Sequence, residues 1–289
     1  MHRFCGKVWS DGDIERIRAM IRESPTANRA ALSRSVADAF AWRMADGRPK
    51  EMSCRVAMLK MERAGLIQLP APIHRPSRTV AVFESAASDP QPLLDVALSA
   101  LSDLRLELVA PGPSLRLWNE FVARYHYLGY APMAGAQLRY FIRDGDRVLG
   151  AMGFGAAAWK VAARDQHIGW SPAIREKRLH LVVNQTRFLI LPWVRCQNLA
   201  TRTLKLALAR LGGDWMARYS YRPVLVETFV DATRYLGTCY KAGNWACVGD
   251  TRGRSKYDRF HAGKSPVKSI WLMPLRRDFR AVLTAETAG

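Results

Sequence analysis

The chain has 289 residues, 49% of them hydrophobic, which is enough for one large domain or two ordinary domains with buried cores. Its 44 lysines and arginines against 25 aspartates and glutamates give a formal net charge of +19, which favours a polyanionic partner, with DNA the leading candidate. No run of about 18 apolar residues and no secretory signal is present, so the sequence argues against membrane association and predicts a cytoplasmic protein.

The front of the chain predicts three short helices and a strand. Apolar residues recur at helical spacing over residues 11–23, between Asn28 and Gly47, and over residues 50–64. Residues 66–70 predict a short strand that leads into a hairpin or wing. We therefore expect a winged-helix-like DNA-binding domain over residues 1–70, with a three-helix accessory bundle as the alternative.

The third of these helices is the predicted DNA reader. Its pattern is expected to bury Met52, Val56, Leu59 and Met61. The same pattern leaves three cations exposed, and on a recognition helix they would contact DNA: Arg55, Lys60 and Arg63.

The next stretch, residues 71–92, is rich in proline, serine and alanine and predicts a linker. The second domain is expected to span residues 93–289. It begins with a predicted helix over 93–104, a strand over 106–109 and a helix over 114–124. Two strands, 136–142 and 148–154, flank Asp144-Gly145, which is a strong hairpin signal.

The second half of this domain predicts a mixed sheet. A polar and aromatic loop is expected over 164–170, followed by strands over 179–184 and 186–191. Asn198 is expected to cap a helix that Gly212-Gly213 closes, and strands follow over 224–231 and 267–275. The order strand, helix, strand implies at least one parallel pair. A basic tail after Gly249 adds three candidate DNA contacts: Arg252, Arg254 and Lys256.

Three acids stand at predicted strand ends or site loops: Asp165, Glu227 and Asp231. Together they could hold divalent metal ions, Mg²⁺, Mn²⁺ or Fe²⁺, for phosphodiester cleavage or strand transfer. The alternative is structural: Asp165 pairs with Arg164 or another arginine, and the other two acids anchor loops by accepting backbone N–H bonds.

A second enzymatic hypothesis is base modification. His126 or Tyr240 would act as general acid or base on a nucleobase, and tryptophans such as Trp159, Trp170 or Trp245 could stack on a base flipped out of the duplex. The chain contains no Walker loop, nucleophile elbow or HExxH motif, and its five cysteines form no CxxC pair. ATP hydrolysis, serine esterase chemistry, zincin chemistry and a zinc ribbon are therefore disfavoured.

Longer motifs point to a family. The chain carries YHYLGY at 125–130, GAQLRY at 135–140, RFLILP at 187–192, ETFVD at 227–231 and GTCY at 237–240. These motifs resemble the Druantia anti-phage defence protein DruA family, whose members also occur in transposon-like genes. The resemblance implies a defence or mobile-element context and does not bring a known reaction.

Two further resemblances concern the fold and the site. The strand order resembles the GNAT acyltransferase fold, although the turn VRCQNLA at 194–200 lacks the glycines that cradle a pyrophosphate, which argues against acetyl-CoA binding. Short motifs resemble the phage Mom-like DNA modification proteins, which are associated with iron and adenine modification. That resemblance nominates His126, Tyr127, Asp231 and Tyr240 as site residues.

The expected fold is α+β, a winged-helix-like domain followed by a GNAT-like mixed-sheet domain. The expected function is a DNA-binding protein of anti-phage defence or of a mobile element that cleaves DNA or modifies its bases. A non-catalytic subunit that recruits a helicase or nuclease to DNA is the alternative.

Overall fold

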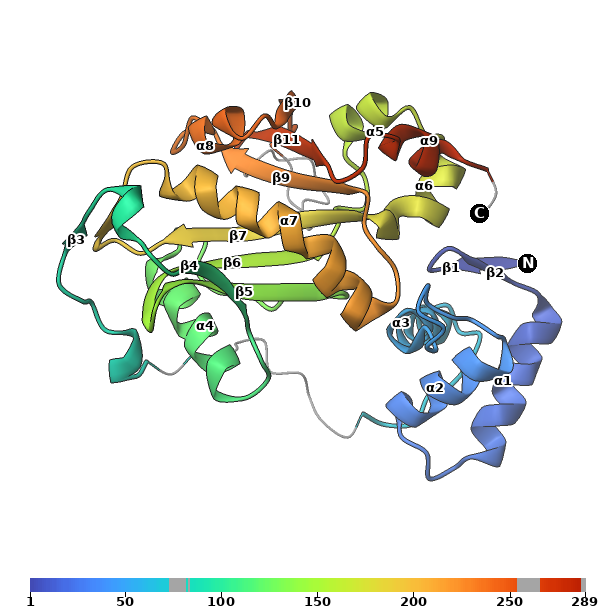
Figure 1. Cartoon of the computed structure of the whole chain (residues 1–289). Helices are drawn as coiled ribbons and strands as arrows, with labels where there is room; N and C mark the ends of the chain where they lie inside the picture. The colour runs from blue at the N-terminus through green and yellow to red at the C-terminus, as the bar shows by residue number, and fades with distance from the viewer. Residues whose placement is uncertain (73–81, 83, 254–265, 287–289) are drawn as a thin grey trace. The chain divides into compact units, whose positions relative to one another are not determined.

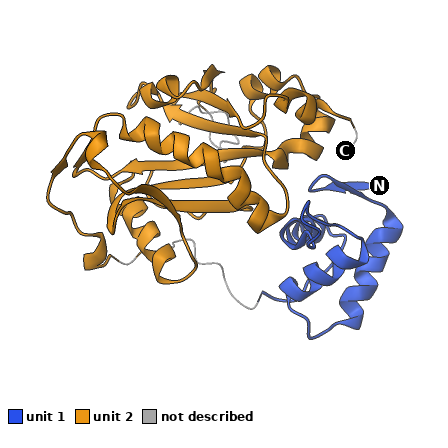
Figure 2. Ribbon diagram, viewed as in Figure 1, with its two compact units in different colours: residues 1–79 blue, residues 80–289 orange. Residues whose placement is uncertain are grey.

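The computed structural model describes residues 1–72, 82, 84–253 and 266–286. The chain forms two compact units, Met1–Thr79 and Val80–Gly289 (Figure 2). Among the described residues, no helix is both long and apolar enough to cross a membrane.

The first unit is a β-hairpin followed by three helices (Figure 1). Strands β1 (His2–Phe4) and β2 (Lys7–Trp9) are joined by Cys5 and Gly6, both with positive φ, as a tight two-residue turn requires. The three helices match the predicted ones: α1 (Asp11–Glu23), α2 (Arg29–Ala39) and α3 (Glu51–Arg63). Trp9 of β2 is fully buried in the core that the helices form.

The strand predicted over residues 66–70 is wrong. This segment is irregular, and its backbone bonds to side chains and to the end of α3 rather than to a neighbouring strand. The N–H of Leu69 donates to Glu62 Oε1 (3.0 Å), and arginine Nε atoms donate to the carbonyls of Leu66 and Pro70. Since Ile67 and Leu69 are buried against the helices, the segment closes the core of the unit.

The apolar face predicted for α3 is also wrong in part. The helix buries Cys54, Ala57, Met58 and Met61, while Met52 is 64% and Val56 41% exposed. At 100° per residue, Met52 and Val56 lie on nearly the opposite side of the helix from the buried residues, and α3 packs the side with the smaller residues against β1 and α2.

The second unit is built on a seven-stranded sheet in the order β10-β11-β9-β7-β6-β5-β4. Its strands are β4 (Leu104–Leu108), β5 (Gln137–Asp144), β6 (Arg147–Ala156), β7 (Val182–Ile190), β9 (Leu225–Asp231), β10 (Ala246–Asp250) and β11 (Lys268–Pro274). All neighbouring pairs are antiparallel except β7 and β9, which are parallel, as the predicted crossover requires. The unit is thus α+β with a large mixed sheet.

Two helices cover opposite faces of this sheet. Phe121 of α4 (Pro113–Tyr125) packs edge-on against Phe141 of β5. The adjacent Tyr140 points to the other face, where its hydroxyl donates to Asp214 of α7 (Leu199–Tyr219) at 2.8 Å. Short elements complete the unit: β3 (Leu94–Asp95), β8 (Val194–Arg195), α5 (Ala162–Ile168), α6 (Pro172–Arg178), α8 (Thr238–Ala242) and α9 (Phe279–Thr284).

Several boundaries in this unit differ from the prediction. Residues 93–104 form no α-helix, because Leu94 and Asp95 pair with β8 instead. The loop expected over 164–170 is largely helix α5, and the two strands expected over 179–191 are the single strand β7. Helix α7 continues through Gly212 and Gly213, where burial of Leu211, Trp215 and Tyr219 offsets about 1 kcal/mol of helix propensity per glycine.

Candidate functional site

The seven-stranded sheet opens between β7 and β9, the only parallel pair among the described strands of this sheet. Strands β7 and β9 are paired from Val182 with Leu225 to Gln185 with Thr228. Both strands continue beyond that point, β7 to Ile190 and β9 to Asp231, without pairing to each other. Clefts outside the carboxyl ends of parallel strands are where open α/β sheets place their ligands.

A pocket of about 390 Å³ lies where the two strands separate. We call it the β7–β9 pocket. Its walls come from the end of α4 with the following loop (125–128), from β7 (185–190), from β9 (228–230), and from the loop and start of α8 (235–240). It therefore brings together His126, Tyr127 and Tyr240, three residues nominated from the sequence.

His126 is the C-cap residue of α4 and is only 9% exposed. Its Nδ1 accepts the backbone N–H of Leu128 (3.2 Å), and its ring stacks on Tyr127 with centroids 4.9 Å apart. Burial, together with the nearby positive charges of Arg187 and Lys268, lowers the pKa of His126 from 6.5 to about 4. The imidazole is therefore neutral at pH 7.

This shift predicts acid lability. The folded protein binds the His126 proton near pH 4 and the unfolded chain near pH 6.5, so the unfolded state binds more protons between these values. The free energy of unfolding should fall by roughly 2–3 kcal/mol as the pH drops from 6.5 to 4. Urea denaturation across this range measures the loss, and a His126→Gln variant should lack that component of the pH dependence. An unchanged slope in the variant would assign the acid lability to other groups.

Tyr240 and Gln185 form a buried pair at the base of the β7–β9 pocket. The Tyr240 hydroxyl donates to Gln185 Oε1 at 3.1 Å, and burial raises the pKa of Tyr240. Gln185 is 4% exposed, and its Nε2 has no hydrogen-bond partner among the described residues. An amide donor left without a partner at this depth is costly, and a hydrogen-bond acceptor that reached it would remove this cost.

Tyr127 and Asp231 lie close to each other near the pocket. Burial raises the pKa of Tyr127, and the nearby charge of Asp231 raises it further. Asp231 does not line the pocket. Its Oδ1 accepts the N–H (3.1 Å) and the hydroxyl (2.6 Å) of Thr233, which shapes the loop that follows β9.

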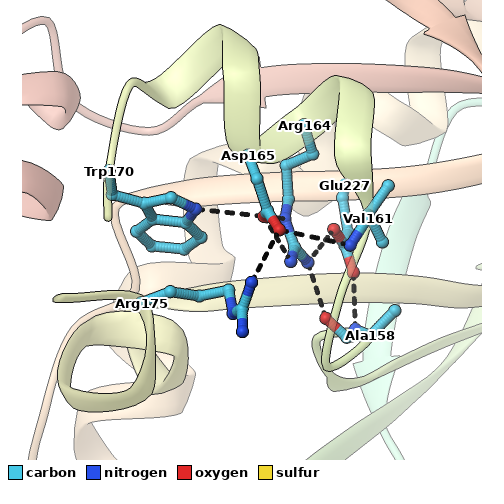
Figure 3. A network of polar contacts seen from close by, with 7 residues as sticks. All are labelled: Ala158, Val161, Arg164, Asp165, Trp170, Arg175 and Glu227. Atoms are coloured by element: carbon cyan, nitrogen blue, oxygen red, sulfur yellow. Dashed lines mark hydrogen bonds and ion pairs between the residues drawn. The ribbon is translucent and has the colours of Figure 1, made fainter. Parts of the chain in front are cut away.

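The other two predicted acids belong to a separate buried network (Figure 3). Glu227 Oε2 accepts from Arg164 Nη1 at 2.7 Å, and both side chains are fully buried. Glu227 Oε1 accepts the backbone N–H of Ala158 at 2.8 Å. Burial raises the pKa of Glu227, while Arg164 opposes this shift.

Asp165 completes this network. Its Oδ1 accepts from Arg164 and from the indole of Trp170, and its Oδ2 accepts from Arg175 (3.2 Å). The four charged groups, two arginines and two carboxylates, balance each other, and they fasten α5 to β9 (Figure 3). The contacts of Asp165, Glu227 and Asp231 are thus those of the structural alternative: arginine pairs and loop anchors.

The structure does not bring the three acids together around one ion. Asp165 and Glu227 are joined through Arg164, and Asp231 lies four residues beyond Glu227 with its own partner, Thr233. Among the described residues there is no group of three histidines, cysteines or acids placed to hold a metal ion. Metal binding by these acids stays a prediction.

The residues predicted to contact DNA differ in their exposure and in their ion pairs. Arg55 pairs with Glu51 one helical turn earlier. Lys60 and Arg63 are exposed and have no carboxylate partner within the described parts of the chain. Arg252 is exposed, whereas Arg254 and Lys256 lie outside the described residues.

Three pocket residues escaped the sequence reasoning: Gln185, Arg187 and Thr228. The sequence gives Gln185 no distinct signal, because it is one of four consecutive polar residues, 184–187, in the middle of β7. Gln185 lines the pocket because the pairing of β7 with β9 ends there, and the local sequence does not specify where this pairing ends.

Known proteins offer limited comparisons. No curated protein matches the chain. Among solved structures, a mutant SpeG spermidine N-acetyltransferase from Vibrio cholerae shares 12% identity at a TM-score of 0.39, covering 60% of this chain and 95% of its own. FeeM, an N-acyl amino acid synthase from uncultured soil microbes, shares 10% at 0.37, covering 63% of this chain and 94% of its own. Scores this low carry no argument, so the GNAT-like fold stays a prediction.

The family comparison is decisive. The family described as Druantia protein DruA matches residues 61–264, which is well over half of the chain and includes every wall of the β7–β9 pocket. The chain therefore belongs to the Druantia protein DruA family, which implies a role in anti-phage defence.

Proposed function

We propose that this protein binds DNA during anti-phage defence and that its second unit acts on a base of that DNA held in the β7–β9 pocket. The pocket itself is the observation that carries the proposal: it is concave, partly apolar, and contains a buried amide donor that has no partner among the described residues. The net charge of +19 supplies the attraction to a polyanion.

The pocket walls suit an extruded base. Aromatic rings line it, among them Tyr127, Phe188 and Tyr240, and such rings can stack on a flat heterocycle. Taking a base out of the duplex costs a few kcal/mol, which stacking and hydrogen bonds in the pocket would offset. Asp165 and Glu227 are engaged with arginines, so the geometry favours this hypothesis over metal-dependent strand cleavage.

The chemical role of the pocket follows from its protonation states. His126 is neutral at pH 7, and the raised pKa values of Tyr127 and Tyr240 keep both hydroxyls protonated. His126 and Tyr127 can donate hydrogen bonds to a base and polarise it, whereas the Tyr240 hydroxyl already donates to Gln185. All three groups are poorly suited to removing a proton from the base.

Helix α3 is the proposed contact to the duplex. Met52, Val56, Lys60 and Arg63 follow each other at intervals of four, four and three residues, so they lie along one face, and all four are exposed. Apolar side chains can contact thymine methyl groups, and cations can contact phosphates. This face therefore has the composition of a groove-binding surface.

Replacing Lys60 and Arg63 together by alanine should weaken DNA binding and reduce the slope of log K against log salt by about two, one for each lost phosphate contact. Fluorescence anisotropy over a salt series measures both quantities. The matched control is Arg43→Ala with Arg276→Ala, which also removes two charges but at arginines paired with Asp38 and Asp278. Equal losses in both double variants would mean that only net charge matters and that α3 is not the contact.

The proposed function is tested by incubating the whole protein with circular and linear DNA, with and without Mg²⁺, Mn²⁺ or Fe²⁺. The DNA is then analysed on gels and, after digestion, by mass spectrometry of its nucleosides. We expect a nucleoside of altered mass in intact strands. A nick with unaltered bases would point to strand cleavage, and a band shift alone would support a non-catalytic subunit that recruits a helicase or nuclease.

A further inference from the structure

We infer that the β7–β9 pocket selects its base by acceptor atoms, so that it takes an oxo base, thymine or guanine, in preference to adenine. This inference rests on the proposed function, because it assumes that the ligand of the pocket is a base. Three nitrogen-bearing side chains that line the pocket carry the inference, since the free position of each one is a hydrogen-bond donor.

Gln185 contributes the first donor. Its Oε1 already accepts the Tyr240 hydroxyl, whereas Nε2 is buried without a partner among the described residues. A ligand atom that accepts a hydrogen bond from Nε2 would remove the cost of that orphaned donor. A ligand amino group at the same place would leave two donors facing each other.

His126 contributes the second donor. Its Nδ1 is occupied by the N–H of Leu128, so the proton of the neutral ring lies on Nε2. The lowered pKa of about 4 preserves this state at neutral pH. The ring can therefore donate one hydrogen bond to a ligand, and it offers no free acceptor.

Arg187 contributes the third donor. Its Nε donates to the carbonyl of Gly129 (3.3 Å) and its Nη1 to that of Thr186 (2.7 Å). It has no carboxylate partner among the described residues, and Nη2 has no protein acceptor there. An arginine side chain has only hydrogen-bond donors, so a ligand atom that bonds to Nη2 must be an acceptor.

Within the described parts of the chain, no aspartate or glutamate lines the pocket, and the acceptors there are neutral hydroxyl oxygens such as that of Tyr240, which bind a donor less strongly than a carboxylate does. Asp231, the nearby carboxylate, accepts from Thr233 instead. On the edge that faces the major groove in a duplex, thymine presents O4 and guanine presents O6 and N7, while adenine presents N7 beside an amino group. Three donors and no carboxylate acceptor therefore match the oxo bases and reject that amino group.

The test uses DNA duplexes with one unpaired, bulged base, because a bulged base costs little to extrude. Four duplexes differ only in that base, thymine, guanine, cytosine or adenine, and a fully paired duplex is the reference. We expect the whole protein to bind the thymine and guanine bulges about tenfold more tightly than the adenine bulge, the discrimination expected of a good polar contact. Tighter binding of the adenine bulge, or equal binding of all four bulges above the paired duplex, would overturn the inference and leave the proposed function standing.

A variant ties the preference to the pocket. Gln185→Glu keeps an acceptor for Tyr240 and replaces the Nε2 donor by an oxygen, so the preference for thymine and guanine should fall by about tenfold. Asn184→Asp makes the same chemical change on the adjacent residue, which does not line the pocket, and should keep the preference. An unchanged preference in Gln185→Glu would refute the role of this donor. If no bulge binds better than the paired duplex, the proposed function itself fails.

Discussion

Arg164→Met is expected to lower the free energy of unfolding by about 3–5 kcal/mol, because it leaves the fully buried Glu227 carboxylate without its cation. Arg164 also joins Asp165 to Glu227 and donates to the carbonyl of Ala158 at 2.7 Å. Its loss therefore releases α5 and the chain before it from β9. Urea denaturation of the whole protein, followed by tryptophan fluorescence, measures the change.

The matched control removes both charges. Replacing Arg164 by methionine and Glu227 by leucine together leaves no unpaired charge at the centre of the network, while Asp165 keeps Arg175. Removing both partners of a buried ion pair is often close to neutral, so the double variant should recover much of the lost stability. A double variant that is as unstable as Arg164→Met would show that packing, and not the unpaired carboxylate, sets the cost.

Gly150→Ala is expected to be at least as damaging, with a loss of about 3 kcal/mol or more. A Cβ at Gly150 of β6 would stand 2.2 Å from the carbonyl oxygen of Leu189, which belongs to the backbone of β7. Backbone cannot rotate away as a side chain can, so β7 must move. Because β7 forms one wall of the β7–β9 pocket, ligand binding should fall together with stability.

Gly155→Ala is the control within the same strand. A Cβ there would meet Thr186 Cγ2 at 3.4 Å and Met133 Sδ at 3.7 Å, which are side-chain contacts near ordinary distances. We expect a change of less than about 1 kcal/mol, measured by the same denaturation experiment. Similar losses at Gly150 and Gly155 would mean that the close approach of β6 and β7 is not what excludes a side chain at Gly150.

The sequence predicted those elements whose signals are local. The three front helices have apolar residues at helical spacing, and the side chains of Ser10 and Asn28 cap two of them. The hairpin of β5 and β6 follows from its glycine turn, and the parallel pair follows from the crossover helix. Elements fixed by distant partners were missed: β3 exists only because β8 pairs with it, and residues 66–70 are held by arginines of α1 and α2.

In the candidate site, too, some features could be predicted from the local sequence and others depend on distant parts of the chain. His126, Tyr127 and Tyr240 were nominated from the sequence, and the structure places them in one pocket. The grouping of Asp165, Glu227 and Asp231 followed from their strand-end positions, whereas their hydrogen-bond partners depend on how α5 folds back on β9. Gln185 and Arg187 line the pocket only because β7 separates from β9, and this separation is a property of the assembled sheet.

The most direct test of the central claim, that a DNA base enters the β7–β9 pocket, is photo-crosslinking. DNA carrying 5-iododeoxyuridine at a bulged position is irradiated with the whole protein, and the cross-linked peptides are sequenced by mass spectrometry. We predict cross-links to the pocket walls, above all to Tyr127 and Tyr240, and their loss in competition with unlabelled bulged DNA. Cross-links confined to α3 and other surfaces, with none in residues 125–128, 185–190, 228–230 or 235–240, would contradict the claim.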